Sequence, residues 1–302
     1  MRTHLRLAAF EWTGKVLGEG EGTRRVFLLD EPDTHLDYHS QRRLLGSIEE
    51  YVKRGQVVVA THSINLINRV PLDQIVLLDY DRDSGQSRVK SMRLEPGAEA
   101  LDINAMGVEL GVENAVLLYE RAFVLFEGQT EETALPPMYE RWTGSKWYLD
   151  GVRFQSGWNN EGAVLLARLL HQKGRPVVAL IDEDTMKLKG FLRQFTRKKL
   201  EGQAHLPPGR IKTIGPVFFE MAFSDDVWAR AIFAATDGKR KPRRAKLLEL
   251  RQDPVEFVKF VAEATEMSKA ELGTVLGSVT KRSEIPPVLT EVFDAAKELA
   301  GP

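Results

Sequence analysis

Cysteine is missing from all 302 residues of this sequence. A chain without cysteine forms no disulfide, holds no cysteine-ligated zinc and has no thiol nucleophile. The absence also fits a protein of the reducing cytosol.

Long apolar runs are missing as well. No stretch approaches the roughly 18 apolar residues of a membrane helix, so no membrane span is expected. The first residues, Met1 to Phe10, include basic side chains but no apolar core long enough for a signal peptide. We therefore expect a cytoplasmic protein with no membrane partner.

The sequence has almost no net charge, because 42 Lys and Arg face 43 Asp and Glu. Attraction to nucleic acid must therefore come from local clusters. One such cluster is 238–246, which has six basic residues and no acid. A second lies in 187–200, where helical spacing puts Lys189, Arg193 and Arg197 on one face. Either run could contact the phosphate backbone of DNA without selecting a base sequence, and a solvated surface explains the first run equally well.

Strand-like apolar runs alternate with amphipathic stretches, which predicts an α/β chain with mostly parallel sheets. The length suggests two domains. Before the break at Glu95-Pro96-Gly97 we expect strands at 26–29, 56–60 and 74–78, a helix at 38–54, a turn at 79–85 and a returning strand at 88–94. After it we expect strands at 122–126, 147–154, 176–181 and 210–214, helices at 130–142, 161–173 and 187–200, and a helical tail from 222. The predicted segments are a first domain at 1–97, a helical linker at 98–119, a catalytic core at 120–225 and a helical region at 226–302.

The first predicted strand ends in two acids, Asp30 and Glu31. At the carboxyl edge of a sheet, one acid can hold Mg²⁺ beside phosphates and a second can orient an attacking water. Asp33-Thr34-His35-Leu36-Asp37 follows, and His62 comes after the next strand. A pair of acids alone would indicate only a strand end, but the ordered set is more specific.

This set resembles the latter half of an ABC-type ATPase. The resemblance makes Asp30 the Walker B acid, Glu31 the catalytic glutamate and His62 the switch histidine, with 33–37 as the D-loop. It implies a partial ATPase lobe in which these three residues contact nucleotide.

The phosphate-binding loop of such an ATPase is absent, since no G-x-x-x-x-G-K-[ST] occurs in the sequence. The glycine-rich segment 18–22 lacks the lysine and hydroxyl at the required offsets. We expect this chain alone to bind ATP poorly and to need a missing amino-terminal ATPase portion as its partner.

A second group of acids follows two later strands. Glu127 ends the strand 122–126, and Glu131 falls in the next helical turn, where the helix dipole favours negative charge. Asp182 ends the strand 176–181, and Asp184 would point the same way if the chain stays extended. Two parallel strands would bring both groups to one sheet edge. Such hard oxygen ligands suit two Mg²⁺ or Mn²⁺ ions that act on a phosphodiester.

The pattern resembles the Toprim domain, with a glutamate at one strand end and D-x-D at a later one. E-G-Q-T-E-E at 127–132, followed by Leu135-Pro136, is similar to the OLD (overcoming lysogenization defect) branch, in which an ATPase module precedes the Toprim module. The resemblance extends over roughly 24–225 and implies that Glu127, Glu131, Asp182 and Asp184 are catalytic metal ligands. It adds Glu220, less securely, as a further ligand.

OLD nucleases also use a lysine near the scissile phosphate, and Lys281 is the best candidate for it in this chain. A fixed cation there would stabilise transition-state charge. An ordinary exposed lysine is an equally good explanation.

The resemblance implies a divalent-metal-dependent DNA endonuclease of the OLD family that is normally regulated by its ATPase. Two alternatives remain open. One is another Toprim enzyme. A topoisomerase would need a tyrosine nucleophile, and none of the six tyrosines lies in a recognisable setting for one. A primase would need a nucleotide site, which the sequence does not reveal. The other is an ATP-gated DNA clamp, which would bind DNA without cutting it. The helical tail could form the contact surface of a homodimer.

Overall fold

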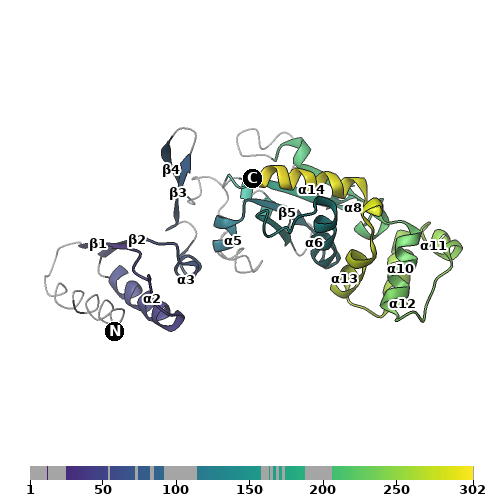
Figure 1. Ribbon diagram of the computed structural model, residues 1–302, viewed down its shortest axis with the longest axis horizontal. Coiled ribbons are helices and arrows are strands. Elements are labelled where there is room, and N and C mark those ends of the chain that lie inside the picture. The colour runs from purple at the N-terminus through teal and green to yellow at the C-terminus, as the bar shows by residue number, and fades with distance from the viewer. Residues whose placement is uncertain are drawn as a thin grey trace. The chain divides into compact units, whose positions relative to one another are not determined.

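The computed structural model describes residues 12, 25–53, 55–71, 74–81, 85–91, 114–157, 163, 166, 167, 170, 171, 174–187 and 206–301. The chain divides into two compact units, 1–118 and 119–302. Among the helices of the described residues, none is both long and apolar enough to span a bilayer. Figure 1 shows the helices and strands of each unit.

The first unit is built on two parallel strands, β1 (Arg25–Asp30) and β2 (Gly55–Ala60). They are joined by α2 (Tyr38–Val52), which begins where the Asp37 side chain accepts the N–H of Ser40. This acceptor occupies one of the donors that a helix start leaves free. The helix packs on one face of the strands, with the rings of Phe27 and Tyr51 5.0 Å apart.

A short helix and a hairpin complete the described part of this unit: α3 (Ile64–Ile67), β3 (Val76–Asp81) and β4 (Gln86–Ser91). The strands β3 and β4 are antiparallel. The turn expected at 79–85 is too long, because Asp79 to Asp81 pair with β4 and so extend the strand.

The second unit contains a parallel sheet of four strands in the order β6-β5-β7-β8. They are β5 (Ala122–Phe126), β6 (Val152–Ser156), β7 (Val177–Asp182) and β8 (Ile211–Ile214). The central strands are buried along nearly their whole length, as parallel strands covered on both faces are. The predicted α/β fold with a parallel sheet is confirmed. The strand expected at 147–154 begins later, because Trp147 to Asp150 form a turn.

Both faces of this sheet are buried. On one face lie α6 (Gln129–Thr143) and the last helix, α14 (Pro287–Ala300), against inward residues such as Val124 and Val178 (Figure 1). Strand residues alternate between faces, so Phe123 and Leu125 point the other way. They are as fully buried as Leu166 and Leu170, which belong to the predicted helix 161–173.

The remaining elements are mostly helical: α5 (Asn114–Tyr119), α8 (Glu183–Lys187), α10 (Asp225–Ala235), α11 (Arg244–Leu250), α12 (Pro254–Thr265), α13 (Lys269–Val279) and the 3₁₀ turns Pro208–Arg210, Phe219–Ala222 and Arg282–Glu284. Trp228 of α10 and Phe257 of α12 belong to the same core cluster as Val124 of the sheet. The helical tail and the sheet therefore share one hydrophobic core.

Two glycines let α13 lie very close to α6. A Cβ on Gly273 would stand 2.2 Å from the carbonyl oxygen of Thr130, and one on Gly277 would stand 2.7 Å from Pro137. The contacts advance together along both helices, because Thr133 bonds to the carbonyl of Ala270 and Arg141 to that of Gly277. The two helices thus run in the same direction.

Candidate functional site

Glu127 and Asp182 end two hydrogen-bonded parallel strands, β5 and β7, so the sheet itself brings them together. One carboxylate oxygen of Glu127 accepts the backbone N–H of Asp182 at 3.0 Å. The other accepts the hydroxyl of Thr185 at 2.9 Å. Burial raises the pKa of Glu127, and these hydrogen bonds partly offset that effect.

Glu131 lies in the first turn of α6 and is 5% exposed. A Cβ on the preceding Gly128 would come within 2.7 Å of its carboxylate, so glycine leaves the space that this side chain fills. Burial raises the pKa of Glu131 to about 8, and the charges of Glu220 and Glu127 add to the effect.

Glu220 joins the same group from the 3₁₀ turn Phe219–Ala222 and is 8% exposed. Its carboxylate accepts the hydroxyl of Thr130 at 3.0 Å. Its backbone carbonyl accepts the indole N–H of Trp228 at 2.9 Å. The sequence suggested Glu220 only weakly, and the fold places it beside the start of α6.

Asp182 is electrostatically coupled to all the other acids. Its burial, followed by the charges of Glu131, Glu127, Glu220 and Asp184, raises its pKa to about 9. The five predicted acids are therefore near neighbours, although they come from three separate segments of the chain.

Asp184 does not continue the strand, which corrects the expectation of an extended D-x-D. The helix α8 begins at Glu183, so Asp184 lies in its first turn, where one of its carboxylate oxygens accepts the N–H of Thr185 at 2.7 Å. The intervening Glu183 accepts the N–H of Val217 at 2.9 Å. Val217 has a φ of +75°, a strained value for a β-branched residue, and Glu183 helps to hold it there.

Glu183, Thr130 and Thr185 were not predicted as site residues. Their signal in the sequence was their position alone, since each is inside or adjacent to one of the two acidic motifs. A hydroxyl beside a carboxylate becomes informative only when the fold shows which oxygen it reaches.

The donors available for a metal are all carboxylate oxygens, which suit Mg²⁺ or Mn²⁺. Within the part of the chain that the structure describes, no three His, Asp or Glu side chains are arranged to hold one ion. The chemistry of the donors fits a divalent ion. In this arrangement, however, both carboxylate oxygens of Glu127 accept hydrogen bonds, one from the backbone of Asp182 and one from Thr185.

The structure does not bring Lys281 to these acids. Arg141, near the end of α6, donates to the carbonyl of Thr280 at 2.6 Å, which places Lys281 at that end of the helix. Glu131 is in the first turn, ten residues earlier, or roughly 15 Å along the axis. A lysine side chain is too short to cover that distance.

In the first unit, Glu31 and His62 come together at the ends of β1 and β2. The His62 imidazole lies 3.8 Å from the Glu31 carboxylate, and the N–H of Glu31 bonds to the carbonyl of Ala60 at 2.8 Å. Glu31 has a φ of +43°, a conformation that is uncommon outside glycine. Asp30 ends β1 with an exposed side chain.

The basic run 238–246 is exposed and follows α10. The side chains of the second basic run, 187–200, and the glycine-rich segment 18–22 lie outside the described residues.

Residues 118–184 match the family model of the "Overcoming lysogenization defect protein-like, TOPRIM domain". The chain contains an OLD-like TOPRIM domain. Residues 16–68 match a second model, "AAA domain, putative AbiEii toxin, Type IV TA system". The expected order, an ATPase segment before the TOPRIM domain, is confirmed by these two matches.

An uncharacterized protein of Methanocaldococcus jannaschii is 31% identical over 70 residues, which span 23% of this chain and 18% of that protein. The C-terminal region of the Burkholderia pseudomallei OLD protein is 12% identical, with a TM-score of 0.45 over 61% of this chain and all of that chain. The corresponding region from Xanthomonas campestris pv. campestris is 14% identical, with the same TM-score over 60% of this chain and 97% of that chain.

Proposed function

We propose that the OLD-like TOPRIM domain is a divalent-metal-dependent DNA endonuclease. The observation that supports this most directly is the meeting of Glu127, Glu131, Asp182, Asp184 and Glu220 at one end of a parallel sheet. A cluster of mutually repelling, largely buried acids destabilises the domain unless a cation or protons offset it. The fold thus concentrates negative charge where a divalent ion would neutralise it.

Glu127, Glu131, Asp182, Asp184 and Glu220 would hold the ions after rotation of their side chains. Two such ions, when bound, activate a water and stabilise the leaving oxygen of a phosphodiester. Thr185 and Thr130 orient Glu127 and Glu220 through the hydrogen bonds described above. The substrate would be DNA held by its phosphate backbone.

For the first unit we propose a regulatory role with nucleotide, through Asp30, Glu31 and His62. The 3.8 Å approach of His62 to Glu31 is the geometry that supports this assignment. ATP binding would need a phosphate loop from elsewhere, because this sequence has none.

Incubation of supercoiled plasmid with the full chain and Mg²⁺ or Mn²⁺ tests the proposal. We expect nicked and linear products, none of them in EDTA. Asp182→Asn combined with Asp184→Asn should lower the cutting rate by a factor of roughly a hundred or more, because two carboxylate ligands of the metal are replaced by neutral amides of similar shape. DNA binding should survive.

The matched control is Glu256→Gln with Glu298→Gln, which removes two exposed carboxylates from α12 and α14. It should cut at the parental rate. Equal cutting by the Asp182/Asp184 variant would refute the site. Relaxed, covalently closed circles would indicate a topoisomerase instead, and binding without any cutting would indicate a clamp.

A further inference from the structure

The segment Lys239 to Arg244, which is the loop after α10 together with the first residue of α11, presents most of the basic residues of the run 238–246 in a fixed conformation. We call it the basic loop. It follows a turn in which Gly238 has a φ of +80°, and the N–H of Arg240 is held by the Thr236 hydroxyl at 3.0 Å. The loop is therefore anchored to the end of α10.

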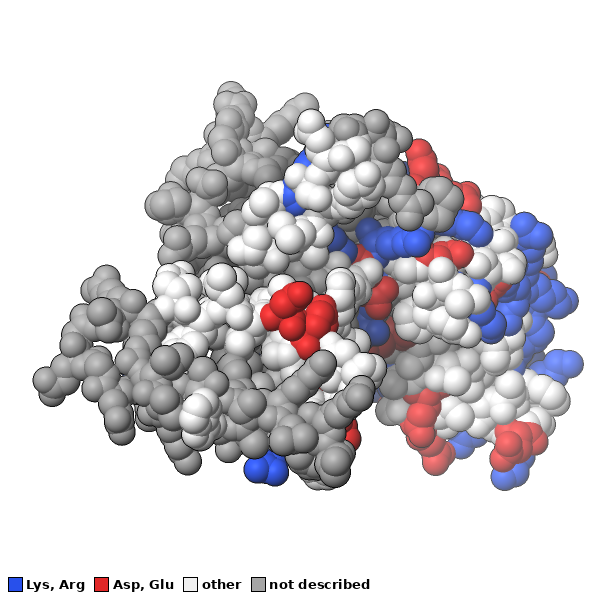
Figure 2. All heavy atoms as spheres, turned by 60° about the vertical axis from the view of Figure 1, so that its left-hand side comes forward, with Lys and Arg blue, Asp and Glu red and all other residues white. Residues whose placement is uncertain are grey.

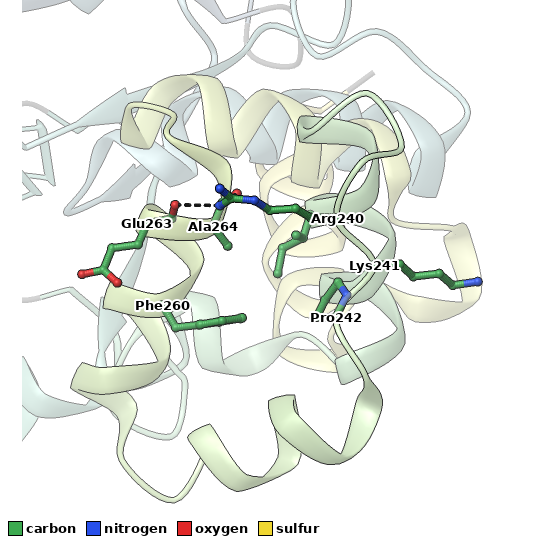
Figure 3. Close-up of a pocket in the computed structure, with 7 residues that line it drawn as sticks. Arg240, Lys241, Pro242, Phe260, Glu263 and Ala264 are labelled. Atoms are coloured by element: carbon green, nitrogen blue, oxygen red, sulfur yellow. Dashed lines mark hydrogen bonds between the residues drawn. The ribbon is translucent and has the colours of Figure 1, made fainter.

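Arg240 fixes the other side of the loop and is not free to bind a ligand. Its guanidinium donates to the backbone carbonyls of Glu263 and Ala264 at the end of α12, at 3.2 and 2.8 Å (Figure 3). It also pairs with the carboxylate of Glu266. Between the loop and α12 lies an open pocket of about 500 Å³, lined mainly by apolar side chains such as Phe260 and Pro242.

Four cations of the basic loop have no acidic partner among the described residues. Lys239, Lys241, Arg243 and Arg244 are exposed, and none of them forms an ion pair with a described residue. Figure 3 shows the Lys241 side chain pointing away from the pocket. In Figure 2, Lys and Arg side chains gather at the right-hand edge of the view, at the helical end of the second unit. Such a group of exposed cations is suited to neutralising the phosphates of a nucleic-acid backbone.

We call the cluster of Glu127, Glu131, Asp182, Asp184 and Glu220 the acidic site. The helix α10 lies between it and the basic loop. It begins five residues after Glu220, and Trp228 in its second turn bonds to the carbonyl of Glu220. Its 11 residues span roughly 16 Å, and the basic loop follows its far end. At about 3.4 Å per base pair, this separation corresponds to about five base pairs of duplex.

We propose that the basic loop binds the phosphate backbone of a DNA duplex about five base pairs away from the phosphate that the acidic site would cut. Only the distance to the cut phosphate rests on the proposed nuclease function. Binding by the loop itself requires neither a metal nor cleavage, so the two ideas can fail separately.

The test compares the full chain with the triple variant Lys241→Ala, Arg243→Ala, Arg244→Ala, using fluorescent 30-base-pair duplexes in EDTA. We expect at least a tenfold weaker affinity near 0.1 M salt. The slope of log K against log [salt] should become shallower by roughly two to three, because each phosphate contact contributes about 0.9. Thermal unfolding should be unchanged, because these side chains are exposed.

The matched control removes three lysines that are ion-paired elsewhere: Lys53, Lys146 and Lys297. Its affinity should stay within twofold of the parent. Equal weakening by both triple variants, parental binding by the first, or a loss confined to RNA of the same length would overturn the proposal.

Cutting then tests the distance. On duplexes with long flanks, the basic-loop variant should raise KM and leave kcat unchanged. On duplexes whose cut site lies closer to the end than about five base pairs, parent and variant should have the same KM. If the basic-loop variant loses affinity in EDTA but the parent cuts no DNA, the proposed DNA-binding surface stands and the proposed nuclease function is wrong. A KM difference that is independent of flank length would reject the proposed spacing.

Discussion

At the level of single residues, the acidic site is defined as much by its hydrogen-bond donors as by its carboxylates. The two oxygens of Glu127 are each engaged, one by the backbone of Asp182 and one by Thr185. Glu220 is held by Thr130. These donors fix the carboxylates near one another in a buried place. Burial first, and then repulsion between the carboxylates, raises the pKa values of Glu131 and Asp182.

The raised pKa values predict how stability depends on pH. The pKa of Glu131 is about 8 and that of Asp182 about 9 in the folded protein, against ordinary values of 4.5 and 3.8. A carboxyl with a raised folded pKa stabilises the fold while it is protonated, and that contribution is lost as pH rises from about 4 to about 9. Without metal, we expect the melting temperature to fall by on the order of 5 °C between pH 6 and pH 8.5.

Circular dichroism melts in EDTA and in Mg²⁺ measure the effect. Added Mg²⁺ should raise the melting temperature more at pH 8.5 than at pH 6, because it binds the charged carboxylates. Asp182→Asn removes one titrating group and should flatten the pH trend in EDTA. An unchanged trend in that variant would show that other groups cause it.

At the level of elements, the site depends on parallel pairing and on one close helix contact. The pairing of β5 with β7 puts Glu127 beside Asp182. The contact of α13 with α6 positions the helix turn that bears Thr130 and Glu131, and Gly273 allows it.

Gly273→Ala should therefore destabilise the second unit and disturb the site. The new Cβ would meet the Thr130 carbonyl and the Thr133 hydroxyl, both at 2.2 Å, so α13 would be pushed away from α6. Overpacking of this kind costs roughly 1–3 kcal/mol. Urea unfolding should show this loss, and plasmid cutting should fall with it.

Gly46→Ala is the control for this change. Gly46 is also helical, in α2, but a Cβ there meets nothing within 4 Å. Alanine has the higher helix propensity, so stability should be unchanged or rise by up to about 1 kcal/mol. If both variants unfold like the parent, the α6–α13 contact is more adaptable than its geometry indicates.

At the level of the whole molecule, two compact units contain the two motifs that the sequence separates. The first unit brings Glu31 and His62 together, but the sequence provides no lysine and hydroxyl to bind the phosphates. We expect purified protein to release phosphate from ATP at close to the background rate, and Glu31→Gln to leave that rate unchanged. Turnover that Glu31→Gln abolishes would contradict this expectation.

The sequence by itself determined the α/β class, the parallel strands and the acids at their ends. Strands such as 122–126 and 176–181 were predicted because buried parallel strands are continuous apolar runs. Glu127 and Asp182 were predicted as neighbours because carboxyl ends of parallel strands share an edge. Such patterns can be predicted from the sequence because they involve residues that are consecutive in the chain.

Only the tertiary structure decided which other groups reach that edge. Asp184 lies in the first turn of a helix, and Lys281 lies at the far end of α6. Glu220 reaches the site from a turn ninety residues after Thr130. Of the six cations in the basic run, two are ion-paired with acids, and the other four form no ion pair within the part of the chain that the structure describes. These outcomes depend on packing between segments distant in sequence, where no local pattern records which side chains will meet.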